Sequence, residues 1–291
     1  MNWISSLQDA INYTEEHLTE ELTFADIAAK AHYSSFHFQR VFSLLCGYSL
    51  GEYIRNRRLT LAGSELASTD IKVMDAALKY GYDSPESFAR AFTRFHGIAP
   101  SQAKAKSAQL KSFSRLFVKL ILDGGSMMNY KVEKREELSV IVKKETFVSD
   151  LETSYREVPL FWTRCRQDGV LDVLYGLASE KGAFGNAIAG ICMNEDASAK
   201  TFDYAIGTAW QGDAVPDGFC VEKIPAHTWV IFECTGAMPE ALQNLQRQVY
   251  SEFFPGSEYV PCGSFDIEVY PQGDMSSHDY KSQLWIPVKI G

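Results

Sequence analysis

Residues 33–47 of the chain read YSSFHFQRVFSLLCG, and residues 82–97 read YDSPESFARAFTRFHG. The two stretches match at an offset of 50 residues, which aligns Phe38 with Phe88. A match at a fixed offset indicates a structural unit that is used twice. Each stretch has a serine where a helix N-cap belongs and a glycine where the helix should end. Each therefore predicts one amphipathic helix with well-defined ends.

A shorter helix is predicted before each of these helices. In the first copy Thr23 is a suitable N-cap for an alanine-rich helix at residues 24–31. The corresponding helix of the second copy is at residues 73–80, so each copy reads as helix, tight turn, helix. A capping box at residues 49–52 opens a longer helix between the copies, which runs to about residue 67. The predicted fold class of this part is an all-α domain with two helix-turn-helix units.

The second half of the chain contains a repeat of its own, at an offset of 89 residues. Residues 130–134 match residues 219–223, and the strand-like residues 140–142 match residues 229–231. Each copy continues with one predicted helix and then two predicted strands. The helices are expected at about 154–167 and 239–253, and the later strands at 187–193, 202–210, 265–270 and 283–288. These elements predict an α+β domain of duplicated β-α-β-β units.

We expect two domains, at residues 1–106 and 129–291, joined by a linker at residues 107–128. The net charge of −9 divides unevenly between the two halves. Residues 1–119 carry 14 Lys and Arg against 12 Asp and Glu, a balance of +2, whereas residues 120–291 carry 14 against 25, a balance of −11. Because the first half is not strongly basic, any contact with nucleic acid must come from individually placed arginines.

The composition is that of a globular protein, with 46% hydrophobic and 22% charged residues among 291. No apolar stretch is long enough to span a membrane and no signal peptide is recognisable, so we expect a cytoplasmic protein without a membrane partner. The six cysteines are scattered and predict reduced thiols rather than disulfides or a zinc site. The histidines have no metal-ligand spacing, and no catalytic or cofactor-binding motif is present. We therefore predict no metal, no cofactor and no catalytic residue.

The polar faces of the two longer repeat helices indicate what the helix pairs do. An α-helix fits the major groove of B-DNA, where Gln and Arg make bidentate contacts with adenine and guanine. The residues expected on the outer faces are Phe36, His37, Gln39, Arg40 and Ser43 in the first copy and Glu86, Ser87, Arg90 and Arg94 in the second. Two such helices on one chain can reach successive groove windows about 34 Å apart, so we expect double-stranded DNA to be bound by a monomer. The alternative is a structural helix bundle with solvated charges, which the duplication and the matched arginines disfavour.

The helical region also resembles a known family. Residues 26–49, with Ala28, Tyr33, Phe38, Arg40 and Gly47, resemble the first DNA-reading unit of AraC-family activators. Residues 76–101 resemble that family's C-terminal signature. The resemblance implies that RNA polymerase is a partner and that six residues contact bases or phosphates, namely Phe36, Gln39, Arg40, Glu86, Ser87 and Arg90. Glu86 departs from the uncharged polar residue of some relatives, although a carboxylate can accept a hydrogen bond from cytosine.

Residues 129–291 resemble the GyrI-like effector-binding domain, and the combination resembles the Rob-like subset of AraC regulators. The resemblance implies a cleft between the two repeats that binds aromatic, often cationic compounds. The charge of −11 and the many large aromatic residues of this half are compatible with such a ligand. The candidate ligand-binding residues are Phe161, Trp162, Tyr204, Trp210, Trp229, Glu268, Tyr270, Gln283 and Trp285.

One position departs from the GyrI-like pattern, because Gln283 stands where the family usually has a ligand-facing glutamate. An amide can donate and accept hydrogen bonds but cannot pair as an anion with a cation. The chain then prefers neutral ligands, uses Glu268 or another acid instead, or has lost sensing. Two further interpretations stay open, a ligand-free interaction domain and a GyrI-like hydrolase. Gln283 disfavours the hydrolase because an amide is not a general base at neutral pH.

Overall fold

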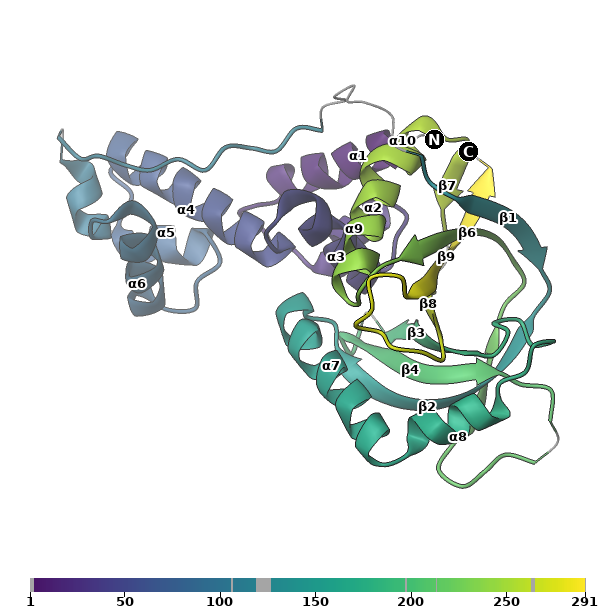
Figure 1. Cartoon of the computed structure of the whole chain (residues 1–291). Helices are drawn as coiled ribbons and strands as arrows, with labels where there is room; N and C mark the ends of the chain where they lie inside the picture. Colours follow the sequence, from purple (N-terminus) through teal and green to yellow (C-terminus); the bar gives the residue numbers. More distant parts are fainter. Residues whose placement is uncertain are drawn as a thin grey trace.

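The computed structural model of the chain describes residues 3–105, 107–118, 127–196, 198–212, 214–262 and 265–290. None of the helices in these ranges has the length and apolar character needed to cross a membrane. The N-terminal part is entirely helical and extends as an arm from a part built on a β-sheet (Figure 1). Its helices are α1 (Trp3–Glu16), α2 (Phe24–Lys30), α3 (Ser35–Cys46), α4 (Leu50–Ser68), α5 (Val73–Lys79), α6 (Pro85–His96) and the 3₁₀ helix η1 (Pro100–Lys104).

The predicted helix pairs are present as α2 with α3 and α5 with α6. Both longer helices start at a serine N-cap, since Ser34 and Ser84 accept hydrogen bonds from backbone N–H groups three residues on. Both end at a glycine in the left-handed region, Gly47 at φ 77° and Gly97 at φ 84°, where other residues are strained. The predicted capping box at the start of α4 is also formed. These local signals were therefore sufficient to place the helices.

Removing the N-cap of α6 is expected to destabilise the arm modestly. Ser84 Oγ accepts from the Ser87 N–H at 3.2 Å, and α6 has no other side-chain cap at this end. Ser84→Ala should lower the free energy of unfolding of this helix pair by about 1 kcal/mol. Thermal unfolding of the full chain measures the change, with Ser251→Ala as a control that removes a serine hydroxyl from a helix interior. Equal melting curves for Ser84→Ala and the control would contradict the capping role.

The C-terminal part contains one antiparallel sheet with helices on one of its faces. In the described residues the strands are ordered β1-β6-β9-β8-β3-β4-β2-β5, with β7 paired to β9. The strands are β1 (Tyr130–Arg135), β2 (Leu138–Val148), β3 (Ala187–Asp196), β4 (Thr201–Ala209), β5 (Cys220–Ile224), β6 (His227–Thr235), β7 (Tyr259–Pro261), β8 (Asp266–Pro271) and β9 (Lys281–Ile290). The helices are α7 (Leu151–Gln167), α8 (Val170–Leu177), α9 (Glu240–Gln248), the π-helix η2 (Val249–Phe253) and α10 (Phe254–Gly256). Of these, α8 and β7 were not predicted.

The strand register decides which side chains face the helices. In β8 and β9, Glu268 is paired with Leu284, whereas Val269 is paired with Gln283. Because paired residues of an antiparallel sheet share a face, Glu268 and Gln283 lie on opposite faces. The face of Glu268 and Leu284 is covered by helices, and we call it the helix-covered face. The other face buries Trp229 and Trp285 in a separate apolar cluster.

The first part of the predicted linker is packed against the arm. Residues 107–118 run along α4 toward the sheet (Figure 1). The backbone N–H groups of this segment donate to side chains of the arm: Phe113 to Thr60 Oγ1 at 2.9 Å and Leu116 to the Tyr53 hydroxyl at 3.1 Å. Residues 107–118 of the predicted linker are thus fixed to the arm. Residues 119–126 lie outside the described residues.

The arm meets the sheet-containing part mainly through its third helix, and α1 also contacts α10. In Figure 1, α3 lies between α7 and α9, and it contacts α7, α9 and η2. These three elements cover the helix-covered face of the sheet. The first helix pair therefore sits over this face, whereas α5 and α6 lie at the far end of α4. A helix of 19 residues such as α4 is about 28 Å long.

Candidate DNA-reading surfaces and effector cleft

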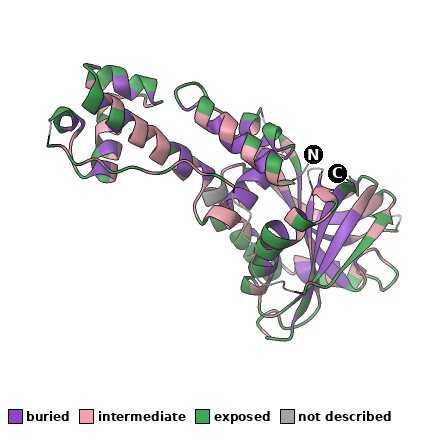
Figure 2. Ribbon diagram, turned by 90° about the horizontal axis from the view of Figure 1, so that it is seen from above, coloured by how far each residue is buried: buried purple, intermediate pink, exposed green. Residues whose placement is uncertain are grey.

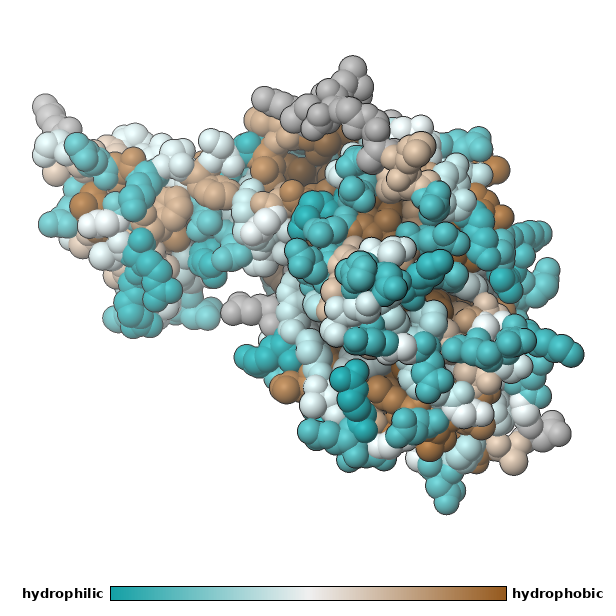
Figure 3. Space-filling view, viewed as in Figure 1, coloured by the Kyte–Doolittle hydropathy of each residue, from teal (hydrophilic) through white to brown (hydrophobic). Residues whose placement is uncertain are grey.

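The predicted reading face of α6 is open to solvent. Glu86, Arg90 and Arg94 are exposed, and Ser87 is half-buried. The inner face of the same helix packs Phe88 and Phe92 into the core of this helix pair. The end of the molecule that carries α5 and α6 projects away from the sheet-containing part (Figure 3). The two arginines of α6 are thus accessible to a large partner.

The corresponding face of α3 is buried, contrary to expectation. Phe36 is 8% exposed, His37 9% and Gln39 3%, and the Arg40 side chain is 15% exposed. In Figure 2, this junction is the place where buried residues of the arm continue into the buried strands. The expected exposure of this face is wrong because the face is covered by residues more than 100 positions away in the chain. In this conformation the side chains predicted to contact bases cannot reach DNA.

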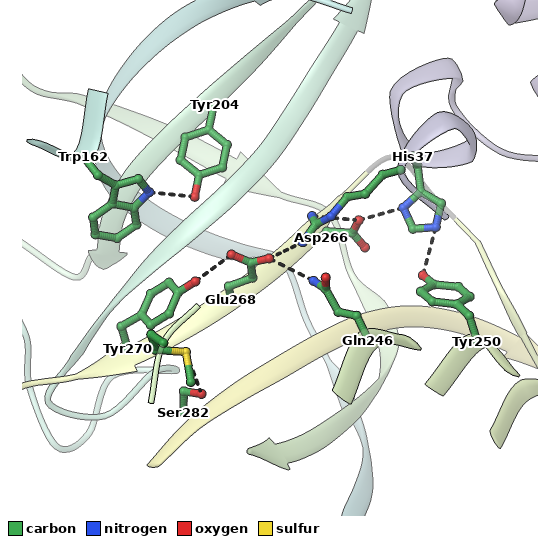
Figure 4. A network of polar contacts seen from close by, with 11 residues as sticks. His37, Trp162, Tyr204, Gln246, Tyr250, Asp266, Glu268, Tyr270 and Ser282 are labelled. Atoms are coloured by element: carbon green, nitrogen blue, oxygen red, sulfur yellow. Dashed lines mark hydrogen bonds and ion pairs between the residues drawn. The ribbon is translucent and has the colours of Figure 1, made fainter. Parts of the chain in front are cut away.

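Arg40 is held by two carboxylates on β8. Its guanidinium forms a hydrogen-bonded ion pair with Glu268, and a second nitrogen lies 3.8 Å from Asp266 Oδ2. Glu268 also accepts hydrogen bonds from Gln246 Nε2 at 3.0 Å and from the Tyr270 hydroxyl at 2.7 Å. Asp266 and Glu268 are two residues apart on one strand, so both point to the helix-covered face. Figure 4 shows the Glu268 carboxylate at the centre of this network.

His37 makes a second buried polar contact. Its Nδ1 lies 2.7 Å from Asp266 Oδ2, and its Nε2 lies 2.9 Å from the Tyr250 hydroxyl of η2 (Figure 4). Burial alone would raise the pKa of the Asp266 carboxyl, but the adjacent His37 and Arg40 lower it below its usual range. The other oxygen of this carboxylate, Oδ1, is buried without a hydrogen-bond partner in the described structure. The charge of Asp266 is therefore stabilised from one side only.

The start of α3 is anchored on the first half of the sheet. The Phe36 ring stacks on Phe202 of β4 with centroids 3.9 Å apart, and the Phe36 N–H donates to Glu195 Oε1 at 2.9 Å. Gln39 Nε2 donates to the Ser149 carbonyl at 3.0 Å. Four of the five residues expected on the outer face of α3 are thus engaged by the sheet-containing part: Phe36, His37, Gln39 and Arg40.

Aromatic side chains surround the Glu268 carboxylate on its other side. The Trp162 indole N–H donates to the Tyr204 hydroxyl at 2.9 Å, and the Trp162 and Tyr270 rings meet edge to face at 5.4 Å (Figure 4). Burial, and next the charge of Glu268, raise the pKa values of the Tyr204 and Tyr270 hydroxyls. Gly190 of β3 makes room for this group, because a Cβ there would lie 2.3 Å from the Tyr204 hydroxyl oxygen. We call this group of side chains, namely Glu268, Tyr270, Tyr204 and Trp162 together with Asp266, the acidic cleft.

Comparisons with known proteins identify both parts. Residues 27–106 match the helix-turn-helix domain family, and residues 141–288, about half of the chain, match the integron-associated effector binding protein family. The chain is 44% identical over 97 residues to the transcriptional activator AarP of Providencia stuartii, a match that covers 33% of this chain and 72% of AarP. This chain is an AraC-type transcriptional regulator. Its C-terminal part belongs to the integron-associated effector-binding family.

Two further proteins illustrate the likeness of this regulator. It is 36% identical over 107 residues to the transcriptional regulator Rob of Salmonella typhimurium. This match covers 37% of this chain and 37% of Rob. The solved structure of SAV2435 bound to tetraphenylphosphonium has 25% sequence identity and a TM-score of 0.48, and it covers 56% of this chain and 94% of that one. The regulator thus shares its DNA-binding part with named transcription factors, and it binds DNA through it.

Within the regulator, the nine predicted ligand residues separate into groups. Trp162, Tyr204, Glu268 and Tyr270 meet in the acidic cleft, and Phe161 packs beneath them against the Tyr204 ring. Trp210 is not part of this group, because it follows the end of β4 and is six residues beyond Tyr204 in the chain. Trp229, Trp285 and Gln283 lie on the opposite face, where Gln283 accepts a hydrogen bond from the Trp285 indole at 2.9 Å. The expectation that Gln283 faces the cleft is therefore wrong, because the strand register turns it away.

Three residues that contact Glu268 or α3 were not among the sequence candidates, namely Asp266, Gln246 and Tyr250. Asp266 shares a strand and a face with Glu268, so the alternation of β8 contained the signal for it. Gln246 and Tyr250 come from α9 and η2, and no sequence pattern singled them out. The space left between these residues and Arg40 has a volume of about 10 Å³, which is room for about one water molecule. A larger hollow of about 530 Å³ lies between β6 and α9, but no aromatic residue lines it.

Proposed function

We propose that this AraC-type regulator activates transcription when a small aromatic cation binds in its acidic cleft. In this proposal α2–α3 and α5–α6 are two helix-turn-helix units, at residues 1–106, that read one asymmetric site as a monomer. The reading residues are Phe36, His37, Gln39 and Arg40 on α3 and Glu86, Ser87, Arg90 and Arg94 on α6. RNA polymerase is the protein partner. The effector domain is the pair of β-α-β-β units at residues 129–291, joined to the arm through residues 107–128.

The observation that supports the effector class is the charge arrangement of the cleft. Asp266 is buried and the Glu268 side chain is only 14% exposed, and among the described residues the basic side chains that contact them belong to α3. A buried carboxylate without a counter-ion is strongly unfavourable. The nearby faces of Trp162, Tyr204 and Tyr270 suit a flat apolar group and attract positive charge. An aromatic monocation fulfils both requirements, whereas an anion fulfils neither.

The cleft provides binding groups rather than a reaction centre. Glu268 is fully engaged by Arg40, Gln246 and Tyr270, and the relatives of the chain are named as regulators. The proposal therefore includes no catalytic step.

Trp162→Ala is expected to weaken binding of an aromatic cation about tenfold, because it removes one aromatic wall of the cleft. Trp162 is half-buried and has no contact with α3 among the described interactions, so this change leaves the arm undisturbed. Trp210→Ala is the matched control, since that half-buried tryptophan lies past the end of β4. Calorimetric titration with tetraphenylphosphonium measures both variants. Equal losses in the two variants, or none in either, would place the ligand elsewhere.

Transcription in vitro tests the proposal as a whole. The preferred DNA site is first selected from a random duplex library with the full chain, and is then placed upstream of a weak promoter. We expect RNA polymerase to produce more transcript when the regulator is present, and more again when tetraphenylphosphonium is added. Failure to select any DNA sequence would reject the assigned reading helices. If the amount of transcript stays the same although the cation binds, the effector role is rejected.

A further inference from the structure

The first reading helix and the proposed effector require the same acidic cleft. We propose that α3 is an internal ligand of this cleft and that the effector activates the regulator by displacing it. The inference rests on the proposed function and adds the mechanism of its regulation. In this mechanism the conformation described above is the repressed one, and cleft and DNA compete for a single helix face.

The competition with DNA follows from the burial of α3. Gln39 donates to the Ser149 carbonyl and Phe36 stacks on Phe202, so both side chains are sealed by the sheet-containing part. Arg40 uses its guanidinium on Glu268. The same guanidinium cannot simultaneously contact a guanine edge or a phosphate. Binding of α3 in a major groove therefore requires that all these contacts break.

The competition with the effector follows from space and charge. The residual volume of about 10 Å³ beside Arg40 is far below the roughly 300 Å³ of the smallest typical ligand pocket. The Glu268 side chain is only 14% exposed and its carboxylate already contacts Arg40, Gln246 and Tyr270, so a cation that pairs with it must replace the Arg40 side chain. Because removal of Arg40 leaves Asp266 and Glu268, whose side chains are 8% and 14% exposed, without this cation, the replacing ligand must itself bring a positive charge. Arg40 thus occupies the position that the aromatic cation would take.

The contact is suited to reversal. Buried ion pairs contribute little net stability, because desolvation offsets most of the attraction. The carboxylate of Asp266 retains one oxygen without a hydrogen-bond partner in the described structure. Phe38 and Phe42 hold α3 within the core of its own helix pair, so α3 stays in the arm when its outer face is released. Release breaks the contacts of this face and the contact of α1 with α10.

The second reading helix remains free in the docked state. Arg90 and Arg94 on α6 are exposed, and no described contact joins α6 to the sheet-containing part. The docked regulator thus offers one reading helix and the released regulator offers two. The docked form binds half of the site, weakly, and the released form binds the whole site.

Cys192 provides a direct test of release by DNA. Its side chain is 8% exposed on the helix-covered face, beside the Arg40 guanidinium, and burial raises its pKa. Addition of the selected DNA duplex to the full chain should increase severalfold the rate at which N-ethylmaleimide labels Cys192, as measured by peptide mass spectrometry. Cys165 and Cys234 are buried elsewhere and serve as internal controls with unchanged rates. Full occupancy by DNA with no change at Cys192 would overturn the inference while leaving DNA recognition intact.

Glu268→Gln tests the counter-ion of Arg40. Neutralising this carboxylate should weaken docking and raise the affinity for the selected site about tenfold without any effector. Glu145→Gln is the matched control, because it neutralises a glutamate of the same sheet whose exposed partner Arg164 makes no described hydrogen bond or ion pair with α3. Fluorescence anisotropy with a labelled duplex measures both variants. Unaltered affinity for Glu268→Gln, or equal gains in both variants, would contradict the role of the pair.

Reciprocal titrations test the coupling between the two ligands. Saturating tetraphenylphosphonium should tighten DNA binding about tenfold, and saturating DNA should tighten tetraphenylphosphonium binding by the same factor. Neutral triphenylphosphine oxide, which has similar aromatic groups but no net charge, should produce no such gain. Independent binding of DNA and the cation would overturn the inference and leave the proposed function standing. Absence of DNA binding or of cation binding would instead reject the proposed function.

Discussion

Replacing Arg90 and Arg94 together with alanine is expected to weaken binding to the preferred DNA site by about 2–6 kcal/mol, since each contact contributes about 1–3 kcal/mol. Both arginines are exposed on α6, so the variant should unfold at the same temperature as the wild type. The loss should persist when α3 is docked, because α6 is accessible in that state. The dependence of the binding constant on salt should also become less steep, by roughly one unit of slope for each phosphate contact removed.

The control for this variant is a second double replacement, Arg156→Ala with Arg247→Ala. These arginines are exposed on α7 and α9, so the net charge changes equally while the arm is untouched. Anisotropy titrations at several salt concentrations distinguish a specific contact from a general charge effect. Equal losses in the two double variants would mean that α6 does not read DNA.

The helices of the arm could be predicted because their signals are local. Serine N-caps, the glycines at φ 77° and 84° and the capping box at Ser49 act within one helical turn. The strands of the sheet were also placed within a few residues, since apolar runs between turns are local patterns as well. α8 was missed because its composition, VLDVLYGL, is equally compatible with a strand.

The placement of α3 could not be predicted because amphipathicity reports only the immediate helix pair. The pattern correctly assigned Phe38 and Phe42 to the core of the arm. It then treated the remaining face as solvent-exposed, although a polar face that carries Arg40 is equally suited to a buried acidic partner. Such a partner is visible only when β8 is brought next to α3, which is a long-range event of folding. The polar face of a reading helix in a multidomain regulator can thus bind either of two surfaces, the DNA or another domain of the same chain.

The acid that faces the cleft could not be predicted either, because it depends on how β8 and β9 pair. Family resemblance directed attention to Gln283, whereas the pairing of β8 with β9 places Glu268 on the helix-covered face instead. A shift of one residue along a strand reverses the face, so a loose motif match is insufficient to assign a ligand residue. Glu268 was nevertheless among the candidates, as the acid that could take over the role of the glutamate missing at position 283.

Replacing Arg57 with methionine is expected to destabilise the arm by about 3–5 kcal/mol near neutral pH, because it leaves a buried carboxylate without its cation. Arg57 on α4 donates to both oxygens of Glu15 on α1, each at 2.8 Å, and to the Phe113 carbonyl at 2.6 Å. The two side chains are only 11% and 7% exposed. This one guanidinium therefore joins α1, α4 and the segment that follows the arm. Lys79→Met is the control, since Lys79 is 44% exposed and its pair with Glu65 should contribute at most about 1 kcal/mol.

The pH dependence of this loss distinguishes the charge from simple packing. Burial would raise the pKa of Glu15, but hydrogen bonds from Arg57 and Tyr53 outweigh it and lower that pKa below the ordinary value of 4.5. A carboxyl whose pKa is lowered by folding stabilises the fold above its unfolded value, and this contribution is lost as the pH falls through the folded value. The difference in unfolding free energy between wild type and Arg57→Met should therefore be full at pH 7 and shrink below pH 4. Calorimetric melts across this range measure it, and a constant difference would mean that packing alone accounts for the role of Arg57.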